Sequence, residues 1–235
     1  MLIVPGVLAG QSPRAANPER PTVATHAYAV ASGYIEIEQG VSARGAGGLG
    51  QTTSWDVNVK IGVTPHIQLA LFGPLLLRTG VGHGPGDWGA ALKLRTAVSD
   101  RVALAIVPAA TLPTGRVRAG LGAGRTLGQL VAVVSADGPG GVHVDLNAGP
   151  LGVGAGRPQW LTTASCGRGL GRWGAAGELF RISAGGAGAR QAGVLGAVTF
   201  APAAWVVLDG GGIAGLGAGS PDDLFIGITT NLGHL

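Results

Sequence analysis

The chain has few charged residues, one cysteine and no long uninterrupted apolar run. Charged residues make up 12% of its 235 residues, about half the fraction usual in soluble globular domains. The single cysteine, Cys166, excludes an internal disulfide framework and a metal site built from several cysteines. The two lysines, Lys60 and Lys93, are too few for the basic run that typically binds nucleic acid. No purely apolar stretch reaches the roughly 18 residues of a transmembrane helix.

Glycine and apolar residues are abundant instead. The 45 glycines and 14 prolines would interrupt long helices, so strands and turns are predicted. The glycines lack the three-residue period of collagen. A hydrophobic fraction of 46% is too high for a disordered chain. The length suits one or two domains.

Apolar and polar residues alternate with a period of two. Between Trp55 and Val63, every second residue is apolar and the residues between them are polar or glycine. The same alternation recurs around 35–38, 87–95, 142–147 and 173–179. This period indicates strands with one apolar and one polar face.

Marking such segments predicts about twelve strands. They are centred near 33–41, 52–63, 67–75, 87–97, 102–112, 126–135, 142–149, 159–167, 173–182, 191–200, 205–212 and 224–234. Short turns alternate with longer loops, which are predicted near 42–50, 76–86, 113–125, 150–158, 183–190 and 213–223. An even strand number with this alternation is typical of outer-membrane barrels. The sequence therefore predicts an all-β fold, a single transmembrane antiparallel up-and-down β-barrel, with short periplasmic turns, longer extracellular loops and both termini on the periplasmic side.

Aromatic residues gather at the predicted strand ends, where the two interfacial girdles of a membrane barrel would place them. The predicted girdle consists of Tyr34, Trp55, Trp88, Trp160, Trp173, Phe200, Trp205 and Phe225. A soluble β-sandwich is the alternative, since its strands also alternate. Its outer face would need many charged residues, whereas the polar face here consists mostly of Gly, Ala, Ser and Thr. Small residues suit a narrow lumen better, which favours the membrane barrel.

The polar face carries a few charged and amide side chains that would point into the lumen. We predict that they line a candidate substrate path, or else pair with one another and close the lumen. These residues are Glu36, Glu38, Asp56, Asn58, Lys60, Asp87, Lys93, Arg95, Asp145, Asn147, Glu178 and Asp209.

The sequence offers little support for catalysis, a metal or a cofactor. Gly169, Gly171 and Gly174 match the spacing of a dinucleotide fingerprint, but a chain this rich in glycine produces the match by chance. No two histidines have the spacing of a zinc site. We therefore expect no catalytic residue, no metal and no cofactor, and Cys166 is interpreted as a small strand residue.

Several short motifs, in order from about residue 21 to 235, resemble the outer-membrane transporter family named for the MetA pathway of phenol degradation. They include Ser32–Gly40, Val59–Val63 and Gly86–Trp88, the Leu112-Pro113-Thr114-Gly115 stretch, Trp205–Asp209 and Thr230–Gly233. The resemblance implies a Gram-negative outer-membrane barrel with a transport role and no established catalytic residues. It also implies small, aromatic or hydrophobic solutes.

The expected function is that of a porin-like transporter or channel for small molecules in the bacterial outer membrane, not an enzyme. The first alternative is a closed barrel with a structural or surface-binding role, and the second is an outer-membrane lipid hydrolase. Residues 28–235 are predicted to form the barrel, and residues 1–27 a lead-in, mobile over 11–27, or the remnant of a signal peptide. Expected partners are outer-membrane lipid and a small-molecule solute, with no nucleic acid. Lipopolysaccharide would contact arginines in or beside the long loops, namely Arg44, Arg78, Arg116, Arg118, Arg125, Arg157 and Arg190.

Overall fold

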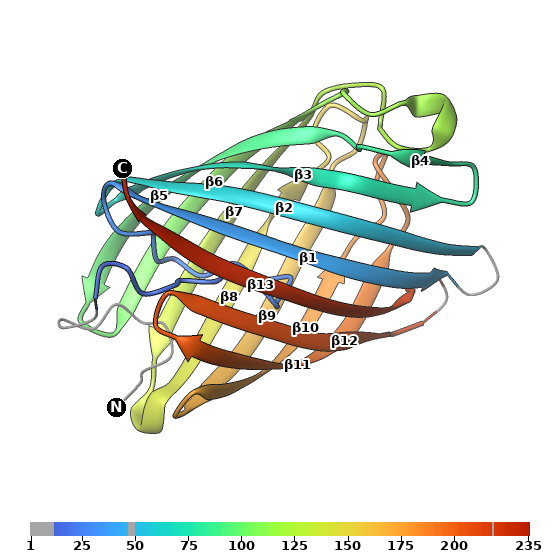
Figure 1. Ribbon diagram of the computed structural model, residues 1–235. Helices are drawn as coiled ribbons and strands as arrows, with labels where there is room; N and C mark the ends of the chain where they lie inside the picture. The colour runs from blue at the N-terminus through green and yellow to red at the C-terminus, as the bar shows by residue number, and fades with distance from the viewer. Residues whose placement is uncertain (1–11, 47–49, 218) are drawn as a thin grey trace.

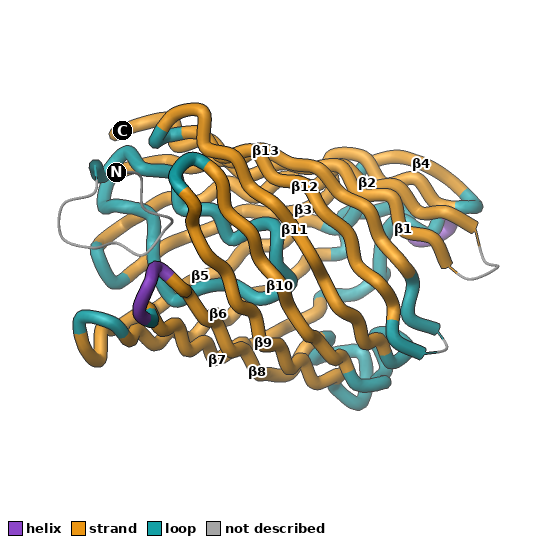
Figure 2. The backbone as a smooth tube through the Cα atoms, turned by 90° about the horizontal axis from the view of Figure 1, so that it is seen from below, coloured by secondary structure: helices purple, strands orange, loops and turns teal. Residues whose placement is uncertain are grey.

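The predicted strands close into one antiparallel barrel in the computed structural model, which describes residues 12–46, 50–217 and 219–235 (Figure 1). The strands are β1 (Tyr34–Ala46), β2 (Gly50–Thr64), β3 (Ile67–Thr79), β4 (Gly82–Gly84), β5 (Trp88–Ser99), β6 (Val102–Leu112), β7 (Leu127–Asp137), β8 (Val142–Leu151), β9 (Gln159–Leu170), β10 (Trp173–Ile182), β11 (Gln191–Ala203), β12 (Val206–Gly215) and β13 (Asp222–His234). Twelve long strands pair in chain order, and β13 closes the wall against β1. Figure 2 shows the strands inclined across the barrel. The predicted fold class is confirmed, with the three-residue β4 as an addition beside β3.

The two ends of the barrel differ in the length of their connections, as predicted. At one end, called the turn end here, neighbouring strands are joined by short turns such as those at 65–66 and 171–172. At the opposite end, called the loop end, the connections include 113–126 and 183–190. The loop predicted at 42–50 is shorter than expected, because β1 continues to Ala46 and β2 begins at Gly50; residues 47–49 lie outside the described part of the chain.

Helix is confined to two short 3-10 turns in the described ranges, η1 (Val117–Ala119) and η2 (Pro139–Gly141). None of the described helices has the length and apolar character needed to cross a membrane.

Alternating residues put apolar side chains outside and charged ones inside, the reverse of a soluble barrel. On β3, Leu69 and Leu71 are 47% and 58% exposed, whereas Gln68 on the opposite face is buried. Glu36 of β1 and Lys60 of β2 face each other across the strand pair and are both fully buried. An exterior of exposed leucine, valine and isoleucine requires an apolar surrounding such as lipid.

Most of the predicted girdle aromatics have exposed or half-buried rings near strand ends. Trp55, Trp160 and Trp173 are exposed, and the Trp173 ring packs against Phe200 with centroids 4.7 Å apart. Tyr34 packs edge-on against His234 at the turn end, and Trp88 is half-buried at the start of β5. The depth of these rings in a membrane stays a prediction.

Phe225 is a correction to the predicted girdle. Its register on β13, directly opposite Ser42 of β1 and Gly211 of β12, turns it into the barrel. There it packs in a small buried cluster with Leu195 and Ala197. A position at the start of a strand predicts a ring in the girdle. The parity of the residue along the strand decides, however, whether its side chain points outward or inward.

Trp205 lies in the turn after β11, beyond a register shift between Phe200 and Ala203. Its ring packs beneath the Arg14 guanidinium, with 5.0 Å between Cζ and the ring centroid. This ring therefore lies at the turn-end rim, in contact with the N-terminal segment.

The lipid-facing exterior can be tested with Leu71→Arg in protein refolded into lipid vesicles. An arginine on the lipid face of a barrel strand costs about 2–4 kcal/mol near the bilayer midplane, so we expect a loss of that order in the free energy of unfolding, measured by urea titration. The control is Val81→Arg, at an exposed position in the turn between β3 and β4, for which little change is expected. Equal stability of the two variants would contradict a lipid-facing β3.

Candidate functional site

Residues 12–33, called the plug here, run through the inside of the barrel before β1 begins (Figure 1). Residues 12–27, the described part of the predicted lead-in, therefore contact the barrel wall, and their mobility stays a prediction. Ala24, His26, Ala27 and Val30 are buried against the inner face of the wall. A polar, proline-containing segment can be held there because the inner wall is itself polar and supplies hydrogen-bond partners.

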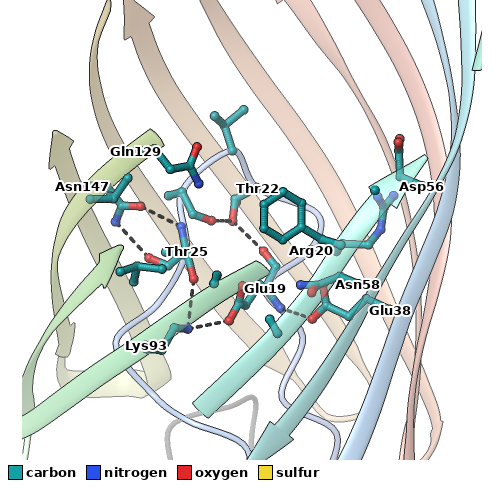
Figure 3. A pocket seen from close by; sticks show the side chains of 18 of the residues that line it. Glu19, Arg20, Thr22, Thr25, Glu38, Asp56, Asn58, Lys93, Gln129 and Asn147 are labelled. Atoms are coloured by element: carbon teal, nitrogen blue, oxygen red, sulfur yellow. Dashed lines mark hydrogen bonds and ion pairs between the residues drawn. The ribbon is translucent and has the colours of Figure 1, made fainter. Parts of the chain in front are cut away.

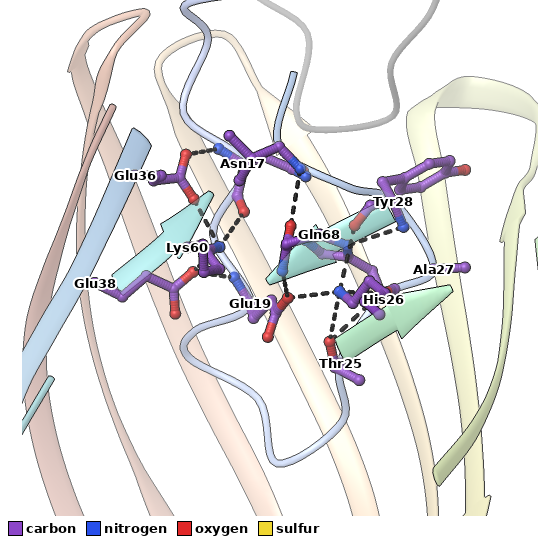
Figure 4. Close-up of polar contacts among 12 residues, drawn as sticks. Asn17, Glu19, Thr25, His26, Ala27, Tyr28, Glu36, Glu38, Lys60 and Gln68 are labelled. Atoms are coloured by element: carbon purple, nitrogen blue, oxygen red, sulfur yellow. Dashed lines mark hydrogen bonds and ion pairs between the residues drawn. The ribbon is translucent and has the colours of Figure 1, made fainter. Parts of the chain in front are cut away.

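The first arm of the plug is bound by an ion cluster on β1 and β2 (Figure 4). The Lys60 ammonium lies between the carboxylates of Glu36 and Glu38, at 2.6 Å and 2.5 Å. It also donates to the backbone carbonyl of Asn17, 2.8 Å away. In return, the N–H groups of Asn17 and Glu19 donate to the Glu36 and Glu38 carboxylates, each at 2.6 Å. The wall and the plug thus share one buried charge cluster.

The tip of the plug is bound from three sides. The Arg20 guanidinium makes a two-point contact with the Asp209 carboxylate of β12, at 3.0 Å and 3.3 Å. Two successive N–H groups, of Val23 and Ala24, donate to the Glu178 carboxylate of β10 at 2.7 Å each. The Asn147 side chain of β8 exchanges hydrogen bonds with the backbone of Thr25, at 2.7 Å and 2.9 Å.

The return arm is bound by polar groups of β3, β5 and β7. The Lys93 ammonium contacts the Glu19 carboxylate and donates to the backbone carbonyls of His26 and Tyr28. The Ala27 N–H donates to Ser135 Oγ at 2.7 Å, and the Val30 N–H to Gln68 Oε1 at 2.8 Å. Lys93 therefore ties the two arms of the plug to each other.

Near the turn end, the plug also contacts a cluster of side chains on β7 and β8. The Tyr28 hydroxyl donates to Asp137, whose other oxygen contacts His143 Nδ1 at 2.7 Å. His143 Nε2 contacts Asp145, and Ser135 Oγ donates to the same carboxylate. The serine thus contacts an aspartate and not the histidine, unlike a hydrolytic triad.

Gly62 shows that the wall is shaped to the plug. A Cβ atom at this position of β2 would overlap the backbone carbonyl oxygens of Val30 and Ala31. Because those contacts are to backbone and cannot move aside cheaply, the return arm can pass β2 only where the wall has no side chain.

All twelve predicted lumen residues lie on the interior of the barrel, but they divide into three groups. Those that contact the plug by hydrogen bonds or ion pairs are Glu36, Glu38, Lys60, Lys93, Asn147, Glu178 and Asp209. Asp56, Asn58 and Asp87 line a cavity beyond the plug. Arg95 lies over the Tyr28 ring, and Asp145 is bound to His143 and Ser135. Whether they form a substrate path stays a prediction.

Several residues that form the contacts between plug and wall are not among the twelve predicted lumen residues. Gln68 and Ser135 occupy inward positions of the strands predicted at 67–75 and 126–135, so parity alone could have found them. Asp137 lies beyond the predicted end of its strand, because β7 continues to this residue. The plug residues Asn17 and Arg20 could not be found this way, because the plug has no period and its hydrogen-bond partners are up to 216 residues away in sequence.

A cavity of about 590 Å³ lies between the plug and the loop end (Figure 3). On one side it is polar, lined by Glu38, Asp56, Asn58 and the plug residue Arg20. On the side of β6 to β10 it is mainly apolar, lined by Val107, Val131, Leu151, Leu161 and Ile182, with the amides of Gln129 and Asn147 among them. The expectation of small inward residues is therefore wrong for this part of the wall, because apolar side chains here face both lipid and lumen.

Charge is segregated between the interior and the exterior. Ten of the twelve carboxylates point into the barrel or contact the plug; the other two, Asp100 and Asp222, are exposed outside it. Both lysines are inside. Eleven arginines are exposed on the exterior or in the loops and turns: Arg14, Arg78, Arg101, Arg116, Arg118, Arg125, Arg157, Arg168, Arg172, Arg181 and Arg190. The interior is therefore anionic and the exterior cationic.

Metal and hydrolase sites have typical arrangements of side chains, with which the described part of the chain can be compared. The described residues contain no group of three or more His, Cys, Asp or Glu side chains arranged to hold a metal ion. Cys166 points outward from β9 and is exposed. No serine hydroxyl in the described part of the chain makes a hydrogen bond to a histidine ring nitrogen.

No family model and no curated protein matches the chain. Among solved structures, it is similar to an outer-membrane channel from Pseudomonas putida F1, with a TM-score of 0.62 and 15% identity over 90% of this chain and 100% of that one. It is also similar to the KdgM porin, alone and in complex with disordered oligogalacturonate, with TM-scores of 0.58 and 0.61 and 8% identity over 84% of this chain and 99% of that one. The chain therefore has the fold of outer-membrane channel barrels.

Proposed function

We propose that this protein is a channel for small molecules in the bacterial outer membrane, and that the plug closes its lumen in the conformation described. The observation that carries the proposal is the polar attachment of residues 12–33 inside a barrel whose exterior is apolar. The turn end would face the periplasm and the loop end the outside, as in other barrels of this kind. The cavity beyond the plug would then be open to solutes arriving from the outside.

The nature of the contacts supports a plug that can move. Its tip is held mainly by hydrogen bonds and ion pairs, such as those to Glu178 and Asn147. Its apolar contacts with the wall are in the return arm, where Ala27 and Tyr28 pack in a buried cluster that includes Val131 and Leu161. A hydrogen bond contributes only about 0.5–1.5 kcal/mol net, because water replaces the lost partner when the lumen is wet. The wall is joined by continuous strand ladders, so the plug would detach long before the barrel opens.

The cavity favours a solute with both apolar and polar parts. An apolar wall that includes Val131 and Leu161 faces a polar wall that includes Asp56 and Asn58. This agrees with the aromatic or hydrophobic solutes that the family resemblance implies, provided that they also carry a polar group. The twelve predicted lumen residues would then form the solute path once the plug has moved.

The closed structural barrel remains the second candidate, because the dense pairing of Lys60 with Glu36 and Glu38 also fills the lumen. The two functions differ in whether current can pass.

The channel is tested by single-channel conductance in planar bilayers, comparing the full chain with Glu178→Ala. Losing the two hydrogen bonds from Val23 and Ala24 should favour plug release by about 2 kcal/mol, which is roughly a thirtyfold rise in the ratio of open to closed times. Thr162→Ala, at an exposed position on the neighbouring β9, is the control and should behave like the full chain. A folded barrel that stays silent both with and without the Glu178 substitution would support the structural candidate instead.

We also propose that exterior arginines at the loop end bind the phosphate groups of lipopolysaccharide. Arg78 of β3 and Arg181 of β10 are exposed on the outer face near the loop end, and neither forms an ion pair in the described part of the chain. Guanidinium groups bind phosphate through paired hydrogen bonds, and that chemistry matches a phosphate-rich outer leaflet.

For this partner, the double variant Arg78→Gln/Arg181→Gln should retain several-fold less lipopolysaccharide after detergent extraction, as measured by phosphate analysis. Arg168→Gln/Arg172→Gln removes the same charge at the turn end and should retain as much as the parent chain. An equal loss in both variants would mean that general charge, and not the loop-end arginines, attracts the lipid.

A further inference from the structure

The Arg20 guanidinium lies over Gly40 and Gly227, the middle members of a row of four residues from four neighbouring strands. Asp56 of β2 is directly opposite Gly40 of β1, Gly40 is opposite Gly227 of β13, and Gly227 is opposite Asp209 of β12. We call this row, with its carboxylates at both ends and its glycines in the middle, the cradle.

The two glycines form a floor without side chains, on which the flat guanidinium lies. A Cβ atom on Gly40 would lie 2.5 Å from Arg20 Cζ, and a Cβ atom on Gly227 would overlap Arg20 Nε. Any larger residue at either position would therefore displace the guanidinium, since it lies directly on the backbone of β1 and β13. This part of the wall therefore leaves room for a cationic group directly against the backbone.

The cradle offers the groups that recognise such a cation. Asp209, whose side chain is 1% exposed, binds the guanidinium through both carboxylate oxygens. The ring of Phe225, two residues before Gly227 on the same face of β13, lies 5.8 Å from Arg20 Cζ at its centroid, within range of a cation–π contact. The second carboxylate, Asp56, accepts a hydrogen bond from Ser54 and forms no ion pair in the described part of the chain.

The cradle contains more carboxylates than are needed to anchor Arg20. One carboxylate binds Arg20, while another carboxylate at the far end of the same row is left without a cation. The Arg20 side chain is 23% exposed and borders the cavity on the loop side, so a solute that enters the cavity reaches the cradle directly. The surrounding interior is anionic, which raises the local concentration of cations.

We propose that the cradle and Phe225 are a binding site for the guanidinium or ammonium group of a small organic solute, and that Arg20 occupies the site as a built-in ligand. This inference rests on the proposed channel function and names a solute class for it. Displacing Arg20 without replacement would leave the buried Asp209 carboxylate uncompensated, which is strongly unfavourable. A cationic solute removes that cost, so its binding and the release of the plug tip favour each other.

The site can be tested by calorimetric titration of the refolded full chain in detergent with N-butylguanidinium. The neutral analogue N-butylurea, which has the same shape and chain, controls for apolar binding. We expect Arg20→Ala to bind N-butylguanidinium at least tenfold more tightly than the parent chain, because the built-in competitor is gone. Adding Asp209→Asn should reverse the gain, whereas adding Asp100→Asn, which removes an exposed carboxylate outside the barrel, should leave it unchanged.

The proposal is overturned if Arg20→Ala brings no gain, if the gain survives Asp209→Asn, or if N-butylurea binds equally well. Folding of each variant is checked by its heat-modifiable migration on gels. Should Asp209→Asn fail to fold in the Arg20→Ala background, Gly40→Val fills the floor of the same cradle and should abolish the gain. Binding is measured without any current, so a barrel that binds the cation but never conducts would refute the channel and leave the site intact.

Discussion

One buried ammonium group, that of Lys60, connects the barrel wall to the plug. It has no access to solvent and lies between the carboxylates of Glu36 and Glu38, so none of the three charges could stay buried without the others. The same three side chains hold the backbone of Asn17 and Glu19. The pairing of β1 with β2 and the position of the plug's first arm therefore depend on the same cluster.

The other contacts between the plug and the inner wall result from an excess of carboxylates over cations inside the barrel. With most of the arginines outside, the inner wall satisfies its acidic groups with backbone N–H groups taken from the plug. Glu36, Glu38 and Glu178 each accept at least one of them. A polypeptide is well suited to this task, because it brings a dense row of donors without needing a cation for each carboxylate. An open lumen has to supply those donors from water or from a cationic solute.

How far the sequence predicts this molecule depends on whether a residue belongs to a periodic element. The alternation of Trp55 to Val63 was sufficient to predict β2, and parity then placed Lys60 inside the barrel. Parity is reliable there because one face of the strand meets lipid and the other a polar lumen. It fails as a guide around Val131, where residues on both faces of β7 are apolar and only the register with neighbouring strands distinguishes inside from outside. Phe225 shows the same limit, since its place at a strand end carried no information about its direction.

The conformation of the plug could not be predicted from the sequence pattern, because it depends on contacts with the barrel wall. Asn17-Pro18 and Arg20-Pro21 favour extended backbone and prevent regular helix, which leaves N–H and C=O groups free to meet partners on eight different strands. Its return arm is fixed at the turn end, where the Gly33 N–H donates to Gly62 and its carbonyl accepts from the Leu235 N–H. In the proposed channel, movement of the plug would therefore be confined to residues before this junction, and above all to the tip that Glu178, Asn147 and Asp209 hold. The contacts at the tip face the cavity, so in the proposed channel they are the ones that an entering solute would reach first.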